Sequence, residues 1–297
     1  MQFDTRQCAA FMHVIDSGSF EAAAQTLHLT ASAVSQRVRA LEIQMGNTLL
    51  TRNRPCRPTP AGQRLLQHLR RVAELEQDLQ SELTSVQTTP VSIAIAINAD
   101  SLDSWVLPAV ADFLIDEQIL LDVCIDDQDH THDLLESGMV LGCISAEAQA
   151  MRGCQAQSLG TMRYYAVASA DYCARWFPQG LNRESARLAP VLTFNRKDKL
   201  QSQFLLKHFG LPENAFPRHY LPATAPYNRA IALGLGWGMM AELMLQDIDA
   251  AKQPVRIAPN LPVDVRLYWH TWKVQTPRLA RLSQTLVGQA RKIMRQD

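Results

Sequence analysis

Three helix start signals lie within the first 46 residues, and no other feature of the chain constrains its fold as much. They are an Asp4–Gln7 capping-box pair, Ser19 and Thr30. Glycines at positions 18 and 46 are expected to end the first and third helices. The pattern predicts short helices at about residues 5–17, 20–27 and 30–45. Helices this short are stable only when they pack together, so the segment should form one helical module.

The third of these helices has two distinct faces. Its apolar residues recur at intervals of four, three and four, and they are expected to face a core: Val34, Val38, Leu41 and Met45. A different face carries small polar and cationic side chains: Ser32, Ser35, Gln36 and Arg39. Two short helices, a tight turn and a helix with such a face are typical of a helix-turn-helix, whose second helix enters the major groove of DNA.

Charge is unevenly distributed along the chain, although the formal net charge of its 297 residues is +0. Residues 1–72 contain nine arginines, no lysine and four acidic residues, a net charge of +5, whereas residues 73–90 carry −4 and the remainder −1. A globally basic nucleic-acid coat is therefore excluded, but a local one is not. Arginine forms bidentate hydrogen bonds with phosphate and guanine, which favours DNA. An ordinary solvated surface is the alternative from charge alone.

A basic segment that contains two prolines follows the third helix. Two extended pieces flank a turn, and this pattern predicts a wing whose arginines lie beside the DNA backbone or minor groove. A helical subdomain with a basic loop and no DNA role is the alternative. Across the third helix and the wing, we expect DNA contacts from Thr30, Ser32, Ser35, Gln36, Arg37, Arg39, Arg52, Arg54, Arg57 and Thr59.

These residues resemble the N-terminal signature of LysR-type transcriptional regulators. The similarity runs through about residues 6–66 and includes Gly18-Ser19-Phe20, Ser32-Ala33-Val34-Ser35-Gln36 and Arg57-Pro58-Thr59. It implies a winged helix-turn-helix that binds double-stranded DNA, a homodimer or homotetramer, and contact with RNA polymerase. One position departs from the pattern: Ala31, which cannot hydrogen-bond a base, stands where many members carry a Gln that touches DNA.

The segment after residue 62 has the periodicity of a dimerising helix. Its apolar residues follow a heptad seam with one gap at Glu76: Leu65, Leu69, Val72, Leu79, Leu83 and Val86. The seam predicts a linker helix over residues 63–87, with a hinge at 87–90. One amphipathic helix packed on its own domain is the alternative, and the family resemblance favours the dimerising linker.

The remaining two thirds alternate strand-like and helix-like segments. Strands are expected at 91–97, 120–125, 139–145, 164–168, 191–194 and 218–221, and helices near 131–137, 170–177, 199–209 and 226–234. This alternation predicts a mostly parallel sheet covered on both faces, divided into two α/β lobes with a cleft. LysR-type effector domains resemble periplasmic binding proteins in this way.

The predicted fold class is therefore a multidomain α+β/α/β chain. We expect a winged helix-turn-helix domain at residues 1–62, a linker helix at 63–87 and an effector-binding domain at 88–297. Within the last, lobe I is expected at about 91–162 plus 268–297, and lobe II at about 163–267.

Asp100 and Ser101 follow the first strand, where ligands of such sheets bind. Ser101 can bind a carboxylate and Asp100 an ammonium group, although simple helix capping explains the same spacing. Asn98-Ala99-Asp100-Ser101 and Leu267-Tyr268-Trp269-His270 also resemble the arginine/lysine-responsive regulators of basic amino-acid export, the chromosome-initiation inhibitor-like branch. That similarity implies lysine or arginine as effector, with contacts from Asn98, Asp100, Ser101, Trp105, Asp127, Thr131, Ser145 and Asn195.

Other chemistries are set aside. His130-Thr131-His132-Asp133 superficially resembles a metal run, but residues two apart on a helix face different ways. The glycines at 234, 236 and 238 lack the dinucleotide spacing. We expect no cofactor, no metal and no catalytic residue. Six scattered cysteines without a CxxC pair favour a reducing cytoplasm, and no apolar run is long enough for a membrane span.

These features together predict a cytoplasmic, DNA-binding regulator of transcription that is not an enzyme. A small-molecule effector is expected to close the cleft and to change the angle between two DNA-binding domains. The alternative is a small-molecule-binding α/β protein or enzyme whose N-terminal helices serve only in assembly.

Overall fold

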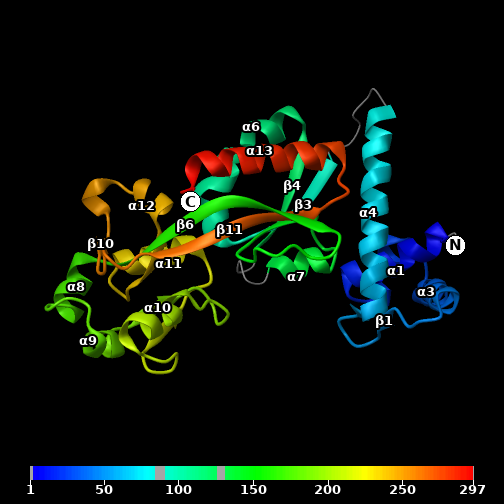
Figure 1. Cartoon of the computed structure of the whole chain (residues 1–297). Helices are drawn as coiled ribbons and strands as arrows, with labels where there is room; N and C mark the ends of the chain where they lie inside the picture. Colours follow the sequence, from blue (N-terminus) through cyan, green and yellow to red (C-terminus); the bar gives the residue numbers. More distant parts are fainter. Residues whose placement is uncertain (1–2, 84–90, 126–130, 297) are drawn as a thin grey trace. The chain divides into compact units, whose positions relative to one another are not determined.

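The computed structural model describes residues 3–83, 91–125 and 131–296 (Figure 1). The chain divides into two compact units, which we call the N-terminal unit, residues 1–89 with 133–140, and the C-terminal unit, residues 90–132 with 141–297. The predicted hinge at 87–90 lies outside the described residues.

The N-terminal unit contains the helices and the wing expected from the sequence. Its elements are α1 (Thr5–Ser17), α2 (Phe20–Thr26), α3 (Ala31–Met45), β1 (Leu50–Thr51), β2 (Arg57–Pro58) and α4 (Pro60–Leu83). The three N-cap side chains, Asp4, Ser19 and Thr30, each accept backbone N–H groups of the first helical turn. Gly18 and Gly46 end α1 and α3 in the left-handed conformation, at φ 71° and 63°. The predicted boundaries of α1 and α3 are therefore confirmed to within one residue.

One apolar core holds these elements together. The inner face of α3 supplies Val34, Val38 and Leu41, which are fully buried. They pack in one cluster with α1, α2, the start of the wing and the first turns of α4. Because the apolar stripe of α3 is used for this core, its polar face remains on the outside.

The seam predicted along α4 is wrong at its first two positions. Leu65 and Leu69 are buried in the core of the N-terminal unit, so they are not available to a second chain. Farther along, Leu75 is 44% exposed and Leu79 is 55% exposed. An apolar edge that could pair with another helix therefore begins after the third turn of α4, and positions 84–87 of the predicted helix fall outside the described ranges.

The C-terminal unit alternates strands and helices. Its first half contains β3 (Val91–Ile97), α5 (Ala99–Ser101), the π-helical turn η1 (Leu102–Val106), α6 (Leu107–Asp116), β4 (Ile119–Ile125), β5 (Gly142–Ser145) and β6 (Cys154–Ala168). Helix α7 (Thr131–Glu136) begins in this unit, but its residues 133–136 belong to the N-terminal unit. Its second half contains α8 (Ala170–Trp176), α9 (Arg183–Leu188), β7 (Val191–Thr193), α10 (Leu200–Phe209), β8 (Arg218–Tyr220), α11 (Thr224–Ala232), β9 (Gly238–Ala241), α12 (Glu242–Gln246), η2 (Ala250–Lys252), β10 (Val255–Arg256), β11 (Val263–Trp272) and α13 (Pro277–Ile293).

The main sheet differs from the expected mostly parallel one. Strand β3 pairs in parallel with β4 and β5, as predicted, but β11 pairs antiparallel with both β5 and β6, and β6 pairs antiparallel with β9 and β10. The sequence segments 154–163 and 263–272 were not predicted as strands. Their pairing reverses the chain direction in the middle of the sheet, which is why the parallel prediction fails there.

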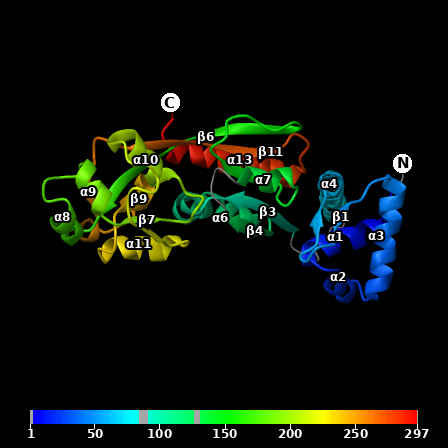
Figure 2. The same cartoon turned by 90° about the horizontal axis from the view of Figure 1, so that it is seen from below.

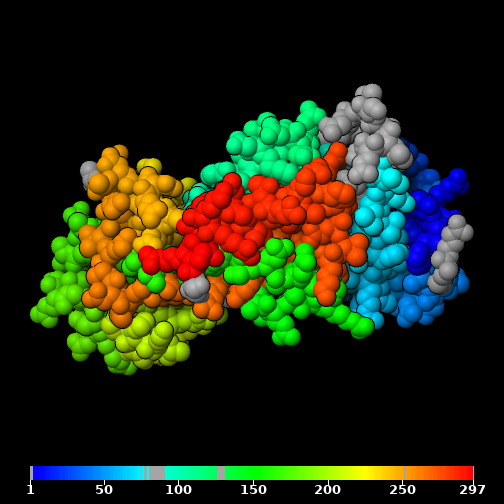
Figure 3. All heavy atoms as spheres, turned by 45° about the horizontal axis from the view of Figure 1, so that its top comes forward, coloured from blue at the N-terminus to red at the C-terminus, as the bar shows by residue number. Residues whose placement is uncertain are grey.

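Strands β6 and β11 extend through both lobes of the C-terminal unit (Figure 2). Lobe I contains β3, β4 and β5, and α6 and α13 lie side by side on it (Figure 3). Lobe II contains β7 to β10 with α8 to α12. The register of the β6–β11 pair shifts between Leu267 and Tyr268, beside Gly160, and the C-terminal segment binds there, since Thr161 N–H donates to the carbonyl of Arg295 at 2.9 Å. The two lobes are thus joined by a continuous paired ribbon.

Candidate functional site

The polar face of α3 is open to solvent. Ser32, Gln36 and Arg39 are exposed, and Ser35 and Arg37 are half-buried. The Thr30 hydroxyl is engaged as the N-cap of α3, where it accepts the N–H of Ala33 at 3.1 Å. The face therefore presents hydroxyl, amide and guanidinium groups within one stripe, which are the groups that read base edges in the major groove. We call Ser32, Ser35, Gln36 and Arg39 the recognition face.

Two arginines of the wing form ion pairs with acidic residues of the same chain. Arg52 lies 3.8 Å from Glu42, whose carboxylate also accepts the N–H of Leu49 at 2.8 Å. Arg54 pairs with Glu21 at 2.7 Å, and both side chains are more than half exposed. Arg57 is exposed. These contacts tie the wing to α2 and α3 while leaving its cations accessible.

Thr59, the last residue predicted to contact DNA, has a structural role in the loop after the wing. Its hydroxyl donates to the carbonyl of Thr48 at 2.7 Å and accepts the N–H of Gly62 at 3.1 Å. The side chain is only half exposed. Its hydrogen bonds therefore orient the segment between β2 and α4.

A second candidate site is a pocket between the two lobes of the C-terminal unit. It encloses a cavity of about 60 Å³. We call it the cleft pocket, and its lining consists of Asn98, Ala99, Asp100, Tyr164, Phe194, Asp198, Leu200, Gln201, Thr224, Tyr227 and Met239. Lobe I contributes the residues that follow β3, and lobe II contributes the rest. Closure or opening of the lobes would therefore change the pocket directly.

Several buried polar atoms at and near this pocket have no hydrogen-bond partner within the described part of the chain. They are Asn98 Oδ1, Ser101 Oγ, Thr193 Oγ1 and Gln201 Oε1. All four residues are less than 5% exposed. Buried polar groups are almost always paired in native proteins, so a cluster of unpaired ones indicates a binding site for a polar molecule.

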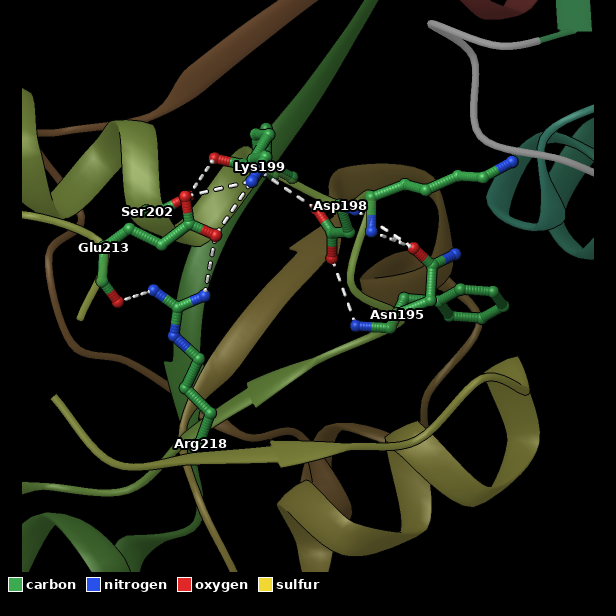
Figure 4. Close-up of polar contacts among 9 residues, drawn as sticks. Asn195, Asp198, Lys199, Ser202, Glu213 and Arg218 are labelled. Carbon is green, nitrogen blue, oxygen red and sulfur yellow. Dashed lines mark hydrogen bonds and ion pairs between the residues drawn. The ribbon is translucent and has the colours of Figure 1, made fainter.

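The loop that leads into α10 positions one carboxylate of the pocket (Figure 4). Asp198 accepts the backbone N–H groups of Phe194 at 3.1 Å and Leu200 at 3.0 Å. Asn195 accepts the N–H of Asp198 at 3.1 Å and so tightens the same turn. The turn therefore holds the Asp198 carboxylate in a fixed orientation at the edge of the pocket.

Two cations near that loop pair with a different acid. Lys199 and Arg218 lie 2.8 Å and 3.2 Å from Glu213 (Figure 4). Hydrogen bonds from Lys199 and then Arg218 lower the pKa of Glu213 below its usual range. Neither cation lines the cleft pocket, whose charged side chains within the described ranges are Asp100 and Asp198.

The predicted effector residues are not all in the pocket. Asn98 and Asp100 line it, and Asn195 lines an adjoining groove. Ser101 is fully buried beside the pocket, while Trp105 packs in the hydrophobic core.

Two further predicted effector residues have hydroxyls engaged by the backbone. The hydroxyl of Thr131 donates to the carbonyl of Ile144, and that of Ser145 accepts the N–H of Glu147 at 3.1 Å. Asp127 lies outside the described residues.

The sequence reasoning missed most of the pocket that lobe II supplies. Asp198, Gln201, Thr224 and Tyr227 were not predicted. A signal for Asp198 was present, because it follows a strand and precedes a helix in the same way as Asp100 does. For Tyr227 and Gln201, no local pattern distinguishes a pocket residue from a core residue.

The described ranges, residues 3–83, 91–125 and 131–296, contain neither a metal-binding cluster nor a membrane-spanning helix. No group of three or more His, Cys, Asp or Glu side chains there could hold a metal ion. No helix within those ranges is both long and apolar enough to cross a membrane.

Two protein-family models match the chain. Residues 5–63 match the bacterial regulatory helix-turn-helix protein, lysR family, and residues 87–291 match the LysR substrate binding domain.

Curated relatives match over nearly the full length. The HTH-type transcriptional regulator ArgP of Pseudomonas aeruginosa is 39% identical, covering 97% of this chain and 96% of the relative. The HTH-type transcriptional regulator LysG of Mycobacterium tuberculosis is 40% identical, covering 99% and 96%.

Solved structures of ArgP and LysG proteins are also similar to this chain. The crystal structure of ArgP from Mycobacterium tuberculosis has a TM-score of 0.86 and 40% identity, with complete coverage of both chains. Full-length LysG from Corynebacterium glutamicum with bound effector Arg has a TM-score of 0.78 and 32% identity, covering 99% of this chain and 100% of that one.

Proposed function

This chain belongs to the LysR family of DNA-binding transcriptional regulators, and from that premise we propose that its effector is a basic amino acid, lysine or arginine, bound in the cleft pocket. The chain is a regulator and not an enzyme. The alternative of an assembly-only N-terminal segment is not favoured, because residues 5–63 match a helix-turn-helix model.

The observation that carries the effector proposal is the character of the pocket lining. Two carboxylates, Asp100 and Asp198, lie in the same lining as the unpaired acceptor oxygens of Asn98 and Gln201. No lysine or arginine lines the pocket in the described part of the chain. Acceptors without cations favour a ligand that brings hydrogen-bond donors and positive charge, since such a ligand pairs the buried acceptors and neutralises the carboxylates.

A basic amino acid also has a carboxylate, and the pocket offers donors for it. Thr224 begins α11, and no side chain caps that helix. Its first backbone N–H groups are therefore available to an anion at a helix N-terminus. The hydroxyl of Ser101, which has no hydrogen-bond partner in the described ranges, is a further donor from the opposite lobe. LysG from Corynebacterium glutamicum, the 32% identical relative solved with arginine, supports the same ligand class.

For DNA, we propose that the recognition face reads bases in the major groove while Arg52, Arg54 and Arg57 contact phosphates. The residues predicted from the sequence, Thr30 and Thr59 included, remain proposals as DNA contacts. We further propose a homodimer or homotetramer with two recognition faces on one pseudo-palindrome, contact with RNA polymerase, and a cytoplasmic location. The exposed apolar edge at Leu75 and Leu79 supports pairing of α4 with a second copy.

Thermal unfolding of the full chain tests the effector. Lysine or arginine at 100 times its dissociation constant should add about 2.7 kcal/mol of stability. For a domain of this size, that raises the melting temperature by about 5–10 °C. Glutamate, whose side chain is acidic, should have no effect. Absence of a shift with both basic amino acids would refute the effector proposal.

A salt titration tests the DNA interface. If arginines of the wing and the recognition face pair with phosphates, log K for operator DNA should fall by about 0.9 for each phosphate contact per unit of log salt concentration. A flat dependence would contradict phosphate-directed binding.

A further inference from the structure

The hydroxyl of Tyr227 lies at the centre of a buried hydrogen-bond network beside the cleft pocket. Tyr227 is in α11 and only 6% exposed. Its hydroxyl oxygen lies 3.0 Å from the backbone nitrogen of Met239 and 3.2 Å from the side-chain nitrogen of Gln201. The carbonyl oxygens of Leu192 and Met239 are each 3.3 Å away. The hydroxyl thus has four polar neighbours from three elements of lobe II.

The hydrogen bonds that the Tyr227 hydroxyl can make fix the orientation of the Gln201 amide. A tyrosine hydroxyl has one proton to donate and two acceptor positions. Burial, followed by the charge of Asp198, raises the pKa of Tyr227, so the proton is retained. That proton is donated to a carbonyl, either of Leu192 or of Met239, because a carbonyl can only accept. The oxygen then accepts from Met239 N–H and from one more donor.

The second donor is Gln201. Its nitrogen Nε2 faces Tyr227, so its oxygen Oε1 is turned away from the hydroxyl. That oxygen has no hydrogen-bond partner within the described ranges, although Gln201 is only 3% exposed and lines the cleft pocket. With the amide reversed, Oε1 would meet the hydroxyl oxygen without a proton between them. The network therefore keeps an unpaired acceptor in the pocket lining.

The local backbone is built to admit this hydroxyl. A Cβ atom at Gly238 would lie 2.2 Å from the Tyr227 hydroxyl oxygen, which is far closer than any real contact. Any other residue at position 238 would displace the hydroxyl and release Gln201. The same close approach brings Met239 N–H within 3.0 Å. Gly238, Tyr227 and Gln201 thus form a single arrangement.

We propose that Gln201, oriented by Tyr227, accepts a hydrogen bond from one of the two cationic groups of the effector and thereby selects a basic amino acid. Gln201 is the specificity-determining residue and Tyr227 a positioning residue. The inference rests on the proposed effector and goes beyond it by naming the neutral acceptor that works alongside Asp100 and Asp198.

The experiment compares three ligands on two variants of the full chain by isothermal titration calorimetry. The ligands are lysine, norleucine, which lacks the side-chain ammonium, and 6-aminohexanoate, which lacks the α-ammonium. Gln201→Met keeps the side-chain volume but removes the amide. Gln203→Met is the matched control, because it is the same substitution at an exposed position of the same helix.

Gln201→Met should weaken lysine binding by about 10- to 100-fold, the loss expected for a hydrogen bond to a charged group. The affinity of one analogue should fall together with that of lysine, and the affinity of the other analogue should not change. The unaffected analogue is the one that lacks the group bound by Gln201. Gln203→Met should leave all three affinities within about twofold.

Two outcomes would overturn this inference while leaving the proposed effector intact. They are an equal loss for all three ligands in Gln201→Met, which marks a structural role, and an unchanged affinity for lysine. A third outcome acts on the proposed function itself: if the unchanged chain binds neither lysine nor arginine, the effector proposal fails and this inference fails with it. If Gln201→Met does not fold, Tyr227→Phe provides the second measurement. This substitution removes the hydroxyl that orients the Gln201 amide. It should weaken binding of lysine more than binding of the unaffected analogue.

Discussion

The recognition face and the cleft pocket both present polar groups without protein partners, but in opposite environments. On α3, Ser32, Gln36 and Arg39 are exposed, so their polar groups can form hydrogen bonds with water when DNA is not bound. In the pocket, the acceptor oxygens of Asn98 and Gln201 are buried and have no hydrogen-bond partner among the residues that the structure describes. A solvated polar face carries little energetic penalty, whereas each buried unpaired acceptor costs about 1–3 kcal/mol. The recognition face therefore costs the N-terminal unit little stability in the absence of DNA, whereas binding of the proposed effector should stabilise the C-terminal unit.

That difference predicts that substitutions in the two regions act on separate ligands. Replacing Arg39 and Arg52 together by Ala should weaken operator binding by about 100-fold, because each lost arginine contact is worth roughly 1–3 kcal/mol. Lysine affinity should remain within about twofold. Fluorescence anisotropy with labelled operator and calorimetry with lysine measure the two effects.

Lys207→Ala is a suitable control for that experiment, since Lys207 is exposed on α10 and far along the chain from the wing. It should leave both affinities unchanged. If the double arginine variant lost DNA and lysine binding equally, the separation of the two regions would be disproved.

A second prediction concerns charge in the pocket. Asp198→Asn removes the carboxylate charge from the lining, and its amide nitrogen also replaces one of the two oxygens that accept the N–H groups of Phe194 and Leu200. Affinity for lysine should therefore fall by about 10- to 30-fold. Operator binding without effector should be unchanged. Asp247→Asn in lobe II is the matched control, because Asp247 is exposed and lies outside the pocket. Equal affinities for lysine in the two variants would show that Asp198 does not contribute to effector binding.

The smallest expected effect lies in the N-terminal unit. Glu21 pairs with Arg54 at 2.7 Å in an exposed position, so it competes with a phosphate for that guanidinium. Glu21→Gln should strengthen DNA binding by about two- to threefold, within the energy of an exposed ion pair. Electrophoretic mobility shifts at low salt measure this gain. A loss of affinity would mean that Glu21 positions Arg54 and does not compete with DNA.

The same comparison explains what the sequence could predict. The recognition face follows from local rules, since its members lie three or four residues apart on one helix with capped ends. The cleft pocket draws on residues between 98 and 239 from both lobes. Only Asn98 and Asp100 among its lining residues were predicted, because they directly follow an evident strand. Tyr227 and Gln201 acquire their roles from the approach of Gly238, and no periodicity records that contact.

Local rules predicted residues 164–168 of β6, but not its first part, 154–163, nor β11. Their segments contain mixed polar and apolar residues, and their pairing joins positions about 100 residues apart. The dimer seam predicted from the heptad pattern of α4 was wrong at its first two positions for a related reason. Leu65 and Leu69 fit a dimer seam equally well in sequence, but the adjacent helices cover them first.

The ribbon formed by β6 and β11 affects how the two lobes can move. Both strands run without interruption from one lobe into the other, so no single loop can act as a free joint. Rotation of lobe II would have to twist and bend a hydrogen-bonded pair, whose ladder is irregular at the register shift beside Gly160. A change in the angle between the lobes would therefore deform the ribbon itself, and the cost of that deformation would offset part of any effector's binding energy.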